Sequence, residues 1–421
     1  MSDLLKKKSA LHCLMLVTRD PYNNHTGRGL VLKTAINFLN KLDIRTTIIC
    51  FDEIALIENT TTYQLGFPSF FDIIKSTIFS FLLRRPVSEL LYYNKKKLRL
   101  IEQIVNDESP DFVYVDMIRL AKYAKIIGLP TILDLDDLLS LRYREAAKSN
   151  HQTGFGYLLK RVPQWINRLF LFFNSQFLAR ESRLLIAREV HYAKNFSCTS
   201  LVSAVEADNF NSAHGTNLIS LPMHIPTIKS ENLTATENKY NALFVGTLNY
   251  DANLQAFQFL AGSVLPLIRA IPGMEDFTLT LIGRAPEDKE LYSYAGVQMV
   301  GYVENLTDYY ISSEVVLAPS FLPGGIKTKV IEALSHGRPT VVNSFALEGL
   351  DNIKEITFQA NTPEEWVENI LKIKSNPIEA AQRAKKGIQY VRDRFGEEKL
   401  QRSWGKAVNS LGLRDPDQTP V

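Results

Sequence analysis

The segment best suited to bind a charged ligand is residues 323–343, which read PGGIKTKVIEALSHGRPTVVN. Gly324 and Gly325 allow the backbone to pass close to a bound molecule. A helix is predicted to begin near Lys327, and its first turn directs unpaired N–H groups and a partial positive charge toward the same place. Lys327 and Lys329 add formal positive charge beside that helix end. This combination suits a diphosphate.

Glu332 lies one turn further along the same predicted helix. An ionised carboxylate only accepts hydrogen bonds, so Glu332 could hold a pair of ribose hydroxyl groups. The helix is predicted to run to His336, because Gly337 can take the left-handed cap without strain. The competing interpretation is a solvated helix with ordinary charged residues. Against it, Ala333 and Leu334 belong to a face that must be buried on a sheet, which directs the charged N-terminus toward a ligand.

Glycine also follows several predicted strands upstream of this helix. The strand ends FVG, LIGR and MVG contain Gly246, Gly283 with Arg284, and Gly301. Ligands of open parallel sheets bind outside the carboxyl ends of the strands. Glycine turns that share this edge would therefore line a crevice with accessible backbone, although any single one of them is an ordinary turn residue.

A parallel sheet is needed to position these residues, and short apolar runs alternate with helical patterns from end to end. The predicted strands cover 11–17, 45–51, 112–115, 131–133, 196–199 and 218–221, and then 242–245, 278–282, 297–300, 315–318 and 339–342. Such alternation predicts an α/β fold with parallel sheets covered on both faces.

The predicted organisation is an N-terminal domain over 1–222, a linker over 223–240, a C-terminal domain over 241–395, a last helix within 396–413 and a tail over 414–421. The linker is rich in Pro, Thr, Asn and charged residues and has no apolar period. No strand follows the last helix, so we expect this helix to pack back on the first domain.

The composition excludes several classes of protein. The 421 residues include 48 Lys plus Arg and 45 Asp plus Glu, and this near balance disfavours a general nucleic-acid binder. Cys13, Cys50 and Cys198 lie far apart, a pattern that predicts neither a disulfide framework nor a zinc site and suits a reducing compartment. No run of about 18 apolar residues predicts a membrane span.

Residues 241–362 resemble the donor-binding domain of the retaining nucleotide-sugar glycosyltransferases of family four (group 1). The similar stretches are FVGTLNYDANLQAFQFL, LTLIGRAPED, VQMVGYVENLTDYYISSEVVLAPS and GGIKTKVIEALSHGRPTVVNSFALEGL. The resemblance is greatest to the branch associated with bacterial exopolysaccharide assembly, in which NY-x-x-N and G-I-x-x-K-x-x-E recur. This chain keeps both patterns, in Asn249, Tyr250 and Asn253 and in Gly325, Ile326, Lys329 and Glu332. In the first domain, ILDLDDLLSLRYREA and LVSAVEADNF are similar less specifically.

The resemblance implies the glycosyltransferase B fold, with two facing Rossmann-like domains and a crevice between them. It implies a nucleoside-diphosphate sugar as the donor substrate, no cofactor and no metal ion, with Lys327, Lys329 and Glu332 in the catalytic machinery. The donor-binding residues that it implies are Gly246, Asn249, Asn253, Gly283, Arg284, Gly301, Val303, Gly324, Gly325 and Ile326.

Two departures from the family pattern affect the donor sugar. Many members carry a glutamate eight residues before the one matching Glu332, where this chain has Gly324. The basic residue that usually follows the first glycine is replaced by Asn249. The sugar and one phosphate contact must therefore be recognised differently.

In the first domain, the stretch 18–29 (TRDPYNNHTGRG) resembles the family's loop that reaches toward the diphosphate and the acceptor. Gly27 and Gly29 would allow close backbone approach, with Arg28 nearby. Where members often have a histidine after the strand 112–115, this chain has Asp116. Its carboxylate is predicted either to orient the transferring sugar or to cap a helix, and both interpretations stay open.

Asp134-Leu135-Asp136 imitates the Asp-x-Asp motif with which the other glycosyltransferase fold holds a divalent cation. Here it ends a buried strand and opens a helix. Capping by Asp136 or Asp137 is therefore the favoured interpretation.

The resulting hypothesis is a retaining glycosyltransferase that moves a sugar from a nucleoside-diphosphate donor to a lipid-linked or polysaccharide acceptor in bacterial surface polysaccharide synthesis. The alternatives are a nucleotide-sugar epimerase of the same fold and an inactive nucleotide-sugar-binding scaffold, which the missing glutamate favours. The expected partners are the nucleotide sugar and the acceptor, without nucleic acid. The expected location is the cytoplasm, with the inner face of the plasma membrane as a candidate docking surface.

Two apolar stretches with basic residues motivate that membrane surface. Residues 70–85 (FFDIIKSTIFSFLLRR) place apolar side chains along one helical stripe that ends in two arginines, and residues 158–183 repeat the mixture. Interfacial helices combine an apolar face with basic residues. For residues 70–85 a core helix is an equally good interpretation, and residues 158–183 are the favoured membrane candidate.

Overall fold

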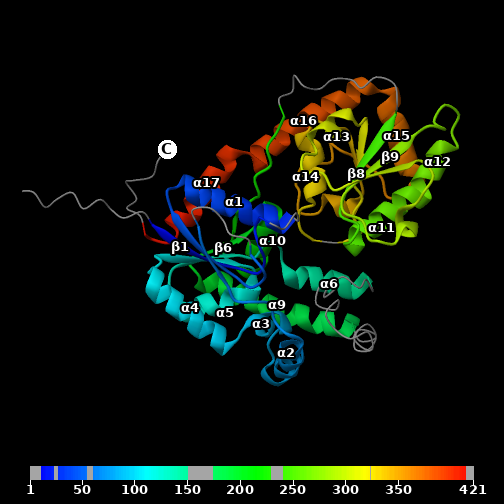
Figure 1. Cartoon of the computed structure of the whole chain (residues 1–421). Coiled ribbons are helices and arrows are strands. Elements are labelled where there is room, and N and C mark those ends of the chain that lie inside the picture. The colour runs from blue at the N-terminus through cyan, green and yellow to red at the C-terminus, as the bar shows by residue number, and fades with distance from the viewer. Residues whose placement is uncertain are drawn as a thin grey trace, which may run out of the picture. The chain divides into compact units, whose positions relative to one another are not determined.

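The computed structural model of the protein describes residues 11–22, 27–54, 60–149, 174–228, 240–322 and 324–413. The chain divides into two compact units (Figure 1). Unit 1 comprises residues 1–224 and 400–421, and unit 2 comprises residues 225–399. Most of the predicted linker (229–239) and the predicted tail (414–421) lie outside the described residues.

Unit 1 is built on a parallel sheet of seven strands in the order β3-β2-β1-β4-β5-β6-β7. The strands are β1 (His12–Val17), β2 (Arg45–Cys50), β3 (Thr61–Gln64), β4 (Phe112–Asp116), β5 (Thr131–Asp134), β6 (Cys198–Leu201) and β7 (Ile219–Ser220). Its α-helices are α1 (Gly27–Lys41), α2 (Phe70–Leu83), α3 (Val87–Tyr92), α4 (Lys95–Glu108), α5 (Ala121–Ile127), α6 (Leu139–Ser149), α9 (Asn174–Asn195), α10 (Ala204–His214) and α17 (Glu397–Asn409).

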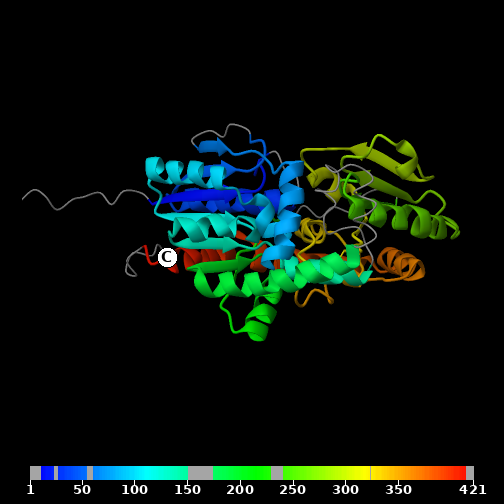
Figure 2. The ribbon, with the colours of Figure 1, turned by 90° about the horizontal axis from the view of Figure 1, so that it is seen from below.

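The central strand β1 shows why this sheet is covered on both faces. All six of its residues are buried, as expected of a parallel strand between two helical layers. Leu14 and Leu16 face one core, while Cys13 and Met15 face a second core on the opposite side of the sheet. That second core also contains Trp404, because α17 returns to unit 1 and packs there beside α1 (Figures 1 and 2).

Unit 2 contains a parallel sheet of six strands in the order β10-β9-β8-β11-β12-β13. The strands are β8 (Asn241–Val245), β9 (Thr278–Ile282), β10 (Val297–Gly301), β11 (Val315–Leu317), β12 (Thr340–Val342) and β13 (Phe358–Gln359). The α-helices are α11 (Asp251–Phe259), α12 (Leu265–Arg269), α13 (Thr307–Ser312), α14 (Thr328–Ser335), α15 (Pro363–Ser375) and α16 (Pro377–Phe395).

The predicted α/β class with two Rossmann-like domains is confirmed, and the differences are local. Residues 87–108 form two helices, α3 and α4, because the side chain of Asn94 accepts a hydrogen bond from the N–H of Lys96 and starts a new helix. The short strands β3 and β13 were not predicted. Among the described residues, no helix is both long and apolar enough to cross a bilayer.

Candidate functional site

The carboxyl ends of β10, β9, β8 and β11 lie side by side at one edge of the unit 2 sheet. Gly246, Gly283 and Gly301 stand at these ends, as the sequence predicted. Gly283 has φ 147°, and a Cβ atom there would lie 2.2 Å from the carbonyl oxygen of Gly246. The turns after β8 and β9 therefore pack backbone against backbone, which keeps side chains away from the edge.

The turn before α14 contains Gly324 and Gly325, both in the left-handed region, with φ 78° and 67°. α14 begins at Thr328, one residue later than predicted, and Lys327 takes the N-cap position without a side-chain cap. The ammonium group of Lys327 folds back and donates to the carbonyl oxygens of Gly324 and Gly325. The turn is thereby fastened to the start of the helix.

Lys329 lies in the first turn of α14 and reaches toward β8 and α11. It is half-buried, its Nζ lies 3.4 Å from Oδ1 of Asn253, and the ammonium group lies 4.9 Å from the centre of the Phe244 ring. Burial, and then the neighbouring charge of Lys327, lower the pKa of Lys329 to about 7. Among the described residues, no acidic side chain forms an ion pair with Lys329. An incoming anion would restore the full charge of this group.

Glu332 lies one turn after Lys329 and is also half-buried. The hydroxyl of Tyr310 donates to Oε2 of Glu332 at 3.4 Å, and burial raises the pKa of Glu332 to about 7. Behind them, the rings of Tyr310 and His336 stack with centroids 4.5 Å apart. Nδ1 of His336 lies 2.8 Å from the carbonyl oxygen of Glu332. This packing fixes the turn of α14 that carries the carboxylate.

The other predicted donor-binding residues surround this edge. Asn249 is exposed in the turn after β8, and Nδ2 of Asn253 donates to the carbonyl oxygen of Thr247 at 3.2 Å. Arg284 lies over the ring of Tyr302, 5.1 Å from its centre. Two further predicted donor-binding residues are half-buried: Val303 follows β10, and Ile326 precedes α14.

Glu348 is a carboxylate at this edge that the sequence did not reveal. Its Oε2 accepts a hydrogen bond of 2.5 Å from the backbone N–H of Gly324. It also lines a cavity of about 770 Å³ beside β12 and β13. Glu348 thus brings a carboxylate to the turn at which the family's first glutamate is missing. Glu348 lies 24 residues after Gly324 in the sequence, so this hydrogen bond could be identified only from the folded structure.

The corresponding edge of unit 1 has opposite electrostatics, because Arg28 is buried among carboxylates. Its guanidinium contacts Asp116 at 2.5 Å, Asp134 at 3.0 Å and Asp136 at 3.4 Å. Only 5% of Arg28 is exposed. The expectation that Arg28 reaches toward a diphosphate does not fit this geometry, since its charge is already balanced within unit 1. Gly27 and Gly29 lie in the first turn of the same helix, α1.

Asp116 is turned into unit 1 and is fully buried. Its Oδ2 accepts hydrogen bonds from the backbone N–H of Thr18 at 2.7 Å and from the Thr18 hydroxyl at 2.5 Å. Burial acts to raise the pKa of Asp116, but Arg28 beside it holds the pKa below its ordinary value. The helix-cap interpretation is wrong, because Met117 takes the cap position of the following turn. Contact with a transferring sugar is likewise not supported, since no part of the carboxylate is exposed.

Asp134 and Asp136 join the same network rather than cap a helix. Oδ1 of Asp134 accepts from the backbone N–H of Asp136 at 3.0 Å, and Oδ2 accepts from the Tyr114 hydroxyl at 2.5 Å. Burial raises the pKa of Asp134 above its ordinary value. The ring of Tyr114 in turn stacks on Trp404 of α17 with centroids 6.0 Å apart. The last helix of the chain therefore supports this buried network.

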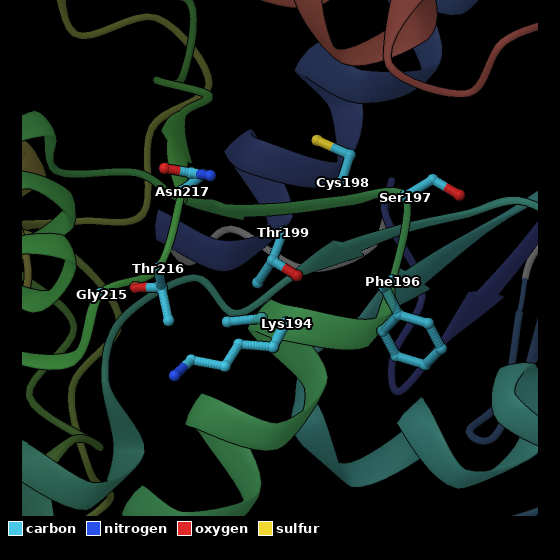
Figure 3. Close-up of a pocket in the computed structure, with 9 residues that line it drawn as sticks. Lys194, Phe196, Ser197, Cys198, Thr199, Gly215, Thr216 and Asn217 are labelled. Carbon is cyan, nitrogen blue, oxygen red and sulfur yellow. The ribbon is translucent and has the colours of Figure 1, made fainter.

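A further pocket in unit 1, of about 310 Å³, lies at the wrong edge for such a site (Figure 3). Its lining includes Phe196 and Ser197, which precede β6, and Thr216 and Asn217, which precede β7. It therefore opens at the amino ends of these strands, opposite the edge where ligands of parallel sheets bind. We do not assign it to the candidate site.

Comparisons with known proteins agree with this fold. Residues 239–376 match the family model of the glycosyl transferases group 1. Anabaena Alr3699/HepE, solved in complex with UDP, has 13% identity and a TM-score of 0.63, with 95% of this chain and 100% of that chain covered. HepE was also solved in complex with UDP-glucose.

Two further solved structures have the same fold. Sucrose-phosphate synthase from Thermosynechococcus elongatus has 13% identity and a TM-score of 0.64, with 95% of this chain and 99% of that chain covered. WaaG, a glycosyltransferase involved in lipopolysaccharide biosynthesis, has 11% identity and a TM-score of 0.56, with 96% of this chain and 100% of that chain covered. The sequence matched none of the curated proteins with which it was compared.

Identities of this size establish a shared fold and leave the activity to be argued from the site. The predicted resemblance is confirmed at the level of the domain and the fold, while the exopolysaccharide branch stays a prediction. The chain has the glycosyltransferase B fold, and residues 239–376 in unit 2 are similar to the glycosyl transferases group 1 family.

Proposed function

We propose that this protein is a retaining glycosyltransferase that transfers a sugar from a nucleoside-diphosphate donor to a lipid-linked or polysaccharide acceptor in bacterial surface polysaccharide synthesis. The domain match and the UDP and UDP-glucose complexes of HepE support a nucleotide-sugar donor. WaaG, which acts in lipopolysaccharide biosynthesis, supports a glycan of the cell surface. Retention follows from the family resemblance.

The observation that carries the proposal is the arrangement at the start of α14. Lys329 is half-buried in the first turn of α14, and no acidic side chain among the described residues forms an ion pair with it. The turn that contains Gly324 and Gly325 immediately precedes this helix. Glu332 follows one turn later on the same helix, and its carboxylate is an acceptor for ribose hydroxyl groups. A nucleoside diphosphate provides both the negative charge and the hydroxyl groups that these residues need.

In the reaction, the bond between the sugar and the diphosphate breaks, and negative charge builds up on the leaving phosphate. Lys329 and the N–H groups at the start of α14 are positioned to stabilise that charge. They interact more strongly with the leaving diphosphate than with the intact donor, which lowers the activation barrier. Lys327 contributes by fastening the glycine turn and by adding charge nearby. This set of groups would replace a metal ion on the diphosphate.

Glu348 offers a carboxylate for the donor sugar. One of its oxygens is held by the backbone of Gly324, which leaves the other oxygen for a sugar hydroxyl group. We propose that it takes over the role of the glutamate that many family members carry eight residues before the position of Glu332.

The test is incubation of the full chain with a panel of UDP-, GDP-, ADP- and TDP-sugars in EDTA, with and without an acceptor extract. Slow hydrolysis of one donor, and its faster consumption with the acceptor, would support a transferase. An isomerised donor would instead identify an epimerase, and binding without turnover would identify a scaffold. A strict requirement for manganese or magnesium would contradict the metal-independent mechanism.

A further inference from the structure

Helix α2 presents its apolar side chains to solvent and its serines to the protein. The exposed side chains are Phe71 (79%), Ile74 (42%), Ile78 (54%), Phe79 (42%), Phe81 (58%), Leu82 (72%) and Leu83 (55%). Ser76 and Ser80 on the opposite side are 4% and 0% exposed. At 100° per residue, the exposed apolar positions cover more than half of the helix circumference. A core helix has the reverse pattern.

The buried side of α2 packs Ile73 against the core of unit 1 and also makes polar contacts. Nη2 of Arg180, in α9, donates to the carbonyl oxygen of Ser80 at 2.7 Å, and Nη1 of Arg180 donates to the Ser80 hydroxyl at 2.9 Å. The Ser80 hydroxyl donates to the carbonyl oxygen of Arg85 at 2.5 Å. A capping box of Ser69 and Asp72 fixes the start of the helix. α2 is thus a well-anchored helix beside α3 and α9 (Figure 1), and the core interpretation of residues 70–85 is wrong.

Basic residues surround the exposed apolar face. Lys75 lies within it and Arg84 follows its end, and both are exposed. Arg180 of α9 also borders this face, with its guanidinium 4.2 Å from the centre of the Phe81 ring.

The acidic residues near α2 all have hydrogen-bond or ion-pair partners. Asp72, half-buried in the first turn of α2, accepts from the backbone N–H and the hydroxyl of Ser69. Glu89 is fully buried and pairs with Arg188 at 2.8 Å. The carboxylate of Glu181 accepts from the backbone N–H of Val87 at 2.8 Å. The surface around α2 is therefore apolar and positively charged.

We propose that α2 is a membrane-docking helix that inserts its apolar face into the interface of a bilayer with anionic headgroups. An apolar face with basic residues gains from both hydrophobic insertion and attraction to anionic lipid. A second copy of the chain is the competing occupant of this face, and the dimer measurement below would identify it. The proposal does not depend on the transferase activity. It rests on α2 alone, because residues 158–173 of the other candidate stretch lie outside the described residues.

The test is co-sedimentation of the full chain with vesicles of phosphatidylcholine, with and without phosphatidylglycerol. The wild type should sediment with the anionic vesicles and less at high salt. Ile78→Ser with Leu82→Ser should reduce the partition coefficient at least about tenfold, with the melting temperature unchanged because both side chains are exposed. Lys75→Glu with Arg84→Glu should remove the preference for phosphatidylglycerol. Ile378→Ser is the matched control, since Ile378 in unit 2 is as exposed as Leu82, at 72%, and should change nothing.

Insertion can be read separately from binding. Brominated lipids should quench the tryptophan fluorescence of the Leu82→Trp variant more than that of the wild type. The Ile378→Trp variant should show no such additional quenching. Wild-type protein that stays in the supernatant with every vesicle would overturn the proposal. So would an α2 variant that binds as the wild type does, or sedimentation velocity that shows a dimer lost in the Ile78/Leu82 variant. Nucleotide binding of each variant, measured alongside, keeps this result distinct from the proposed function.

Discussion

The two units place a cation at the equivalent edge of a parallel sheet, but they treat its charge in opposite ways. In unit 1, Arg28 is buried and contacts three aspartates. In unit 2, Lys329 is half-buried and contacts the side-chain amide of Asn253 and the aromatic ring of Phe244. The charge of the first cation is balanced within its own domain, whereas the second has no acidic partner among the described residues, which is why we propose it as the anion site.

This difference has a physical basis in the cost of burying charge. A buried ion pair offsets the loss of hydration of its members within the protein, and removal of one member leaves the others uncompensated. A desolvated lysine without an acidic partner lowers its pKa instead, and regains its charge when an anion binds. A family resemblance alone cannot separate these two cases, since Arg28 and Lys329 both follow glycines near a helix start.

The largest effect is expected on the stability of unit 1. Arg28→Met should lower the free energy of unfolding by about 3–5 kcal/mol, because it leaves buried carboxylates without their counter-charge. Denaturant unfolding measures this change. The matched control is Arg394→Met, which breaks a partly exposed pair with Asp351 and should cost no more than about 1 kcal/mol. Equal losses of unfolding free energy in Arg28→Met and Arg394→Met would contradict the view that the Arg28 network stabilises unit 1.

The next effect is on nucleotide affinity in unit 2. Glu332→Ala should weaken binding of the preferred nucleoside diphosphate by about 1.5–3 kcal/mol, the scale of a hydrogen bond to a charged group. The melting temperature should change little. Calorimetric titration tests this, and an unchanged affinity would remove Glu332 from the ribose site.

The pH dependence of binding should come from Lys329. Because its pKa in the free protein is about 7, it loses its charge as the pH rises above 7. A bound diphosphate favours the charged form, so affinity should fall by up to about tenfold per pH unit above pH 7. Lys329→Arg keeps its charge and should bind with little change between pH 7 and pH 9. The same slope in both proteins would show that Lys329 is not the titrating group.

The smallest effect is expected at Glu348. Glu348→Gln should leave the affinity for the nucleoside diphosphate within a factor of about three, since the amide oxygen still accepts from Gly324. Turnover of the nucleotide sugar should fall more, by about tenfold, the scale of one hydrogen bond to a charged group. Parallel titrations with the diphosphate and steady-state rates with the sugar nucleotide separate the two effects. Equal losses in both would indicate that Glu348 only supports the turn.

The alternation of apolar runs and helical patterns was enough to predict both sheets and the glycine edge of unit 2. These features arise from local periods and from the rule that the ends of parallel strands share one edge. The Arg28 network was missed because it joins residues from β4, β5 and the start of α1, and local patterns do not show which charges meet. Two aspartates at the ends of adjacent predicted strands, Asp116 and Asp134, were the available signal.

The α2 surface was predicted only as one of two equal interpretations. The apolar stripe of residues 70–85 was visible in the sequence, but the direction in which it points was not. Ser76 and Ser80, four residues apart on the opposite side, were the signal that this side faces the protein. Ser80 accepts hydrogen bonds from Arg180 of α9, whereas the Ser76 hydroxyl bonds within α2. Glu348 had no comparable signal, because its partner is a backbone N–H group.

The central claim is that Lys329 holds a diphosphate at the edge of the unit 2 sheet without a metal ion. Calorimetric titration of UDP, GDP, ADP and TDP in EDTA tests it most directly, with wild type, Lys329→Met and the surface control Lys386→Met. We expect the wild type and the control to bind one of these nucleotides equally, and Lys329→Met to bind it about tenfold to a hundredfold more weakly without a loss of melting temperature. Equal binding by wild type and Lys329→Met, or binding that requires a divalent cation, would contradict this account.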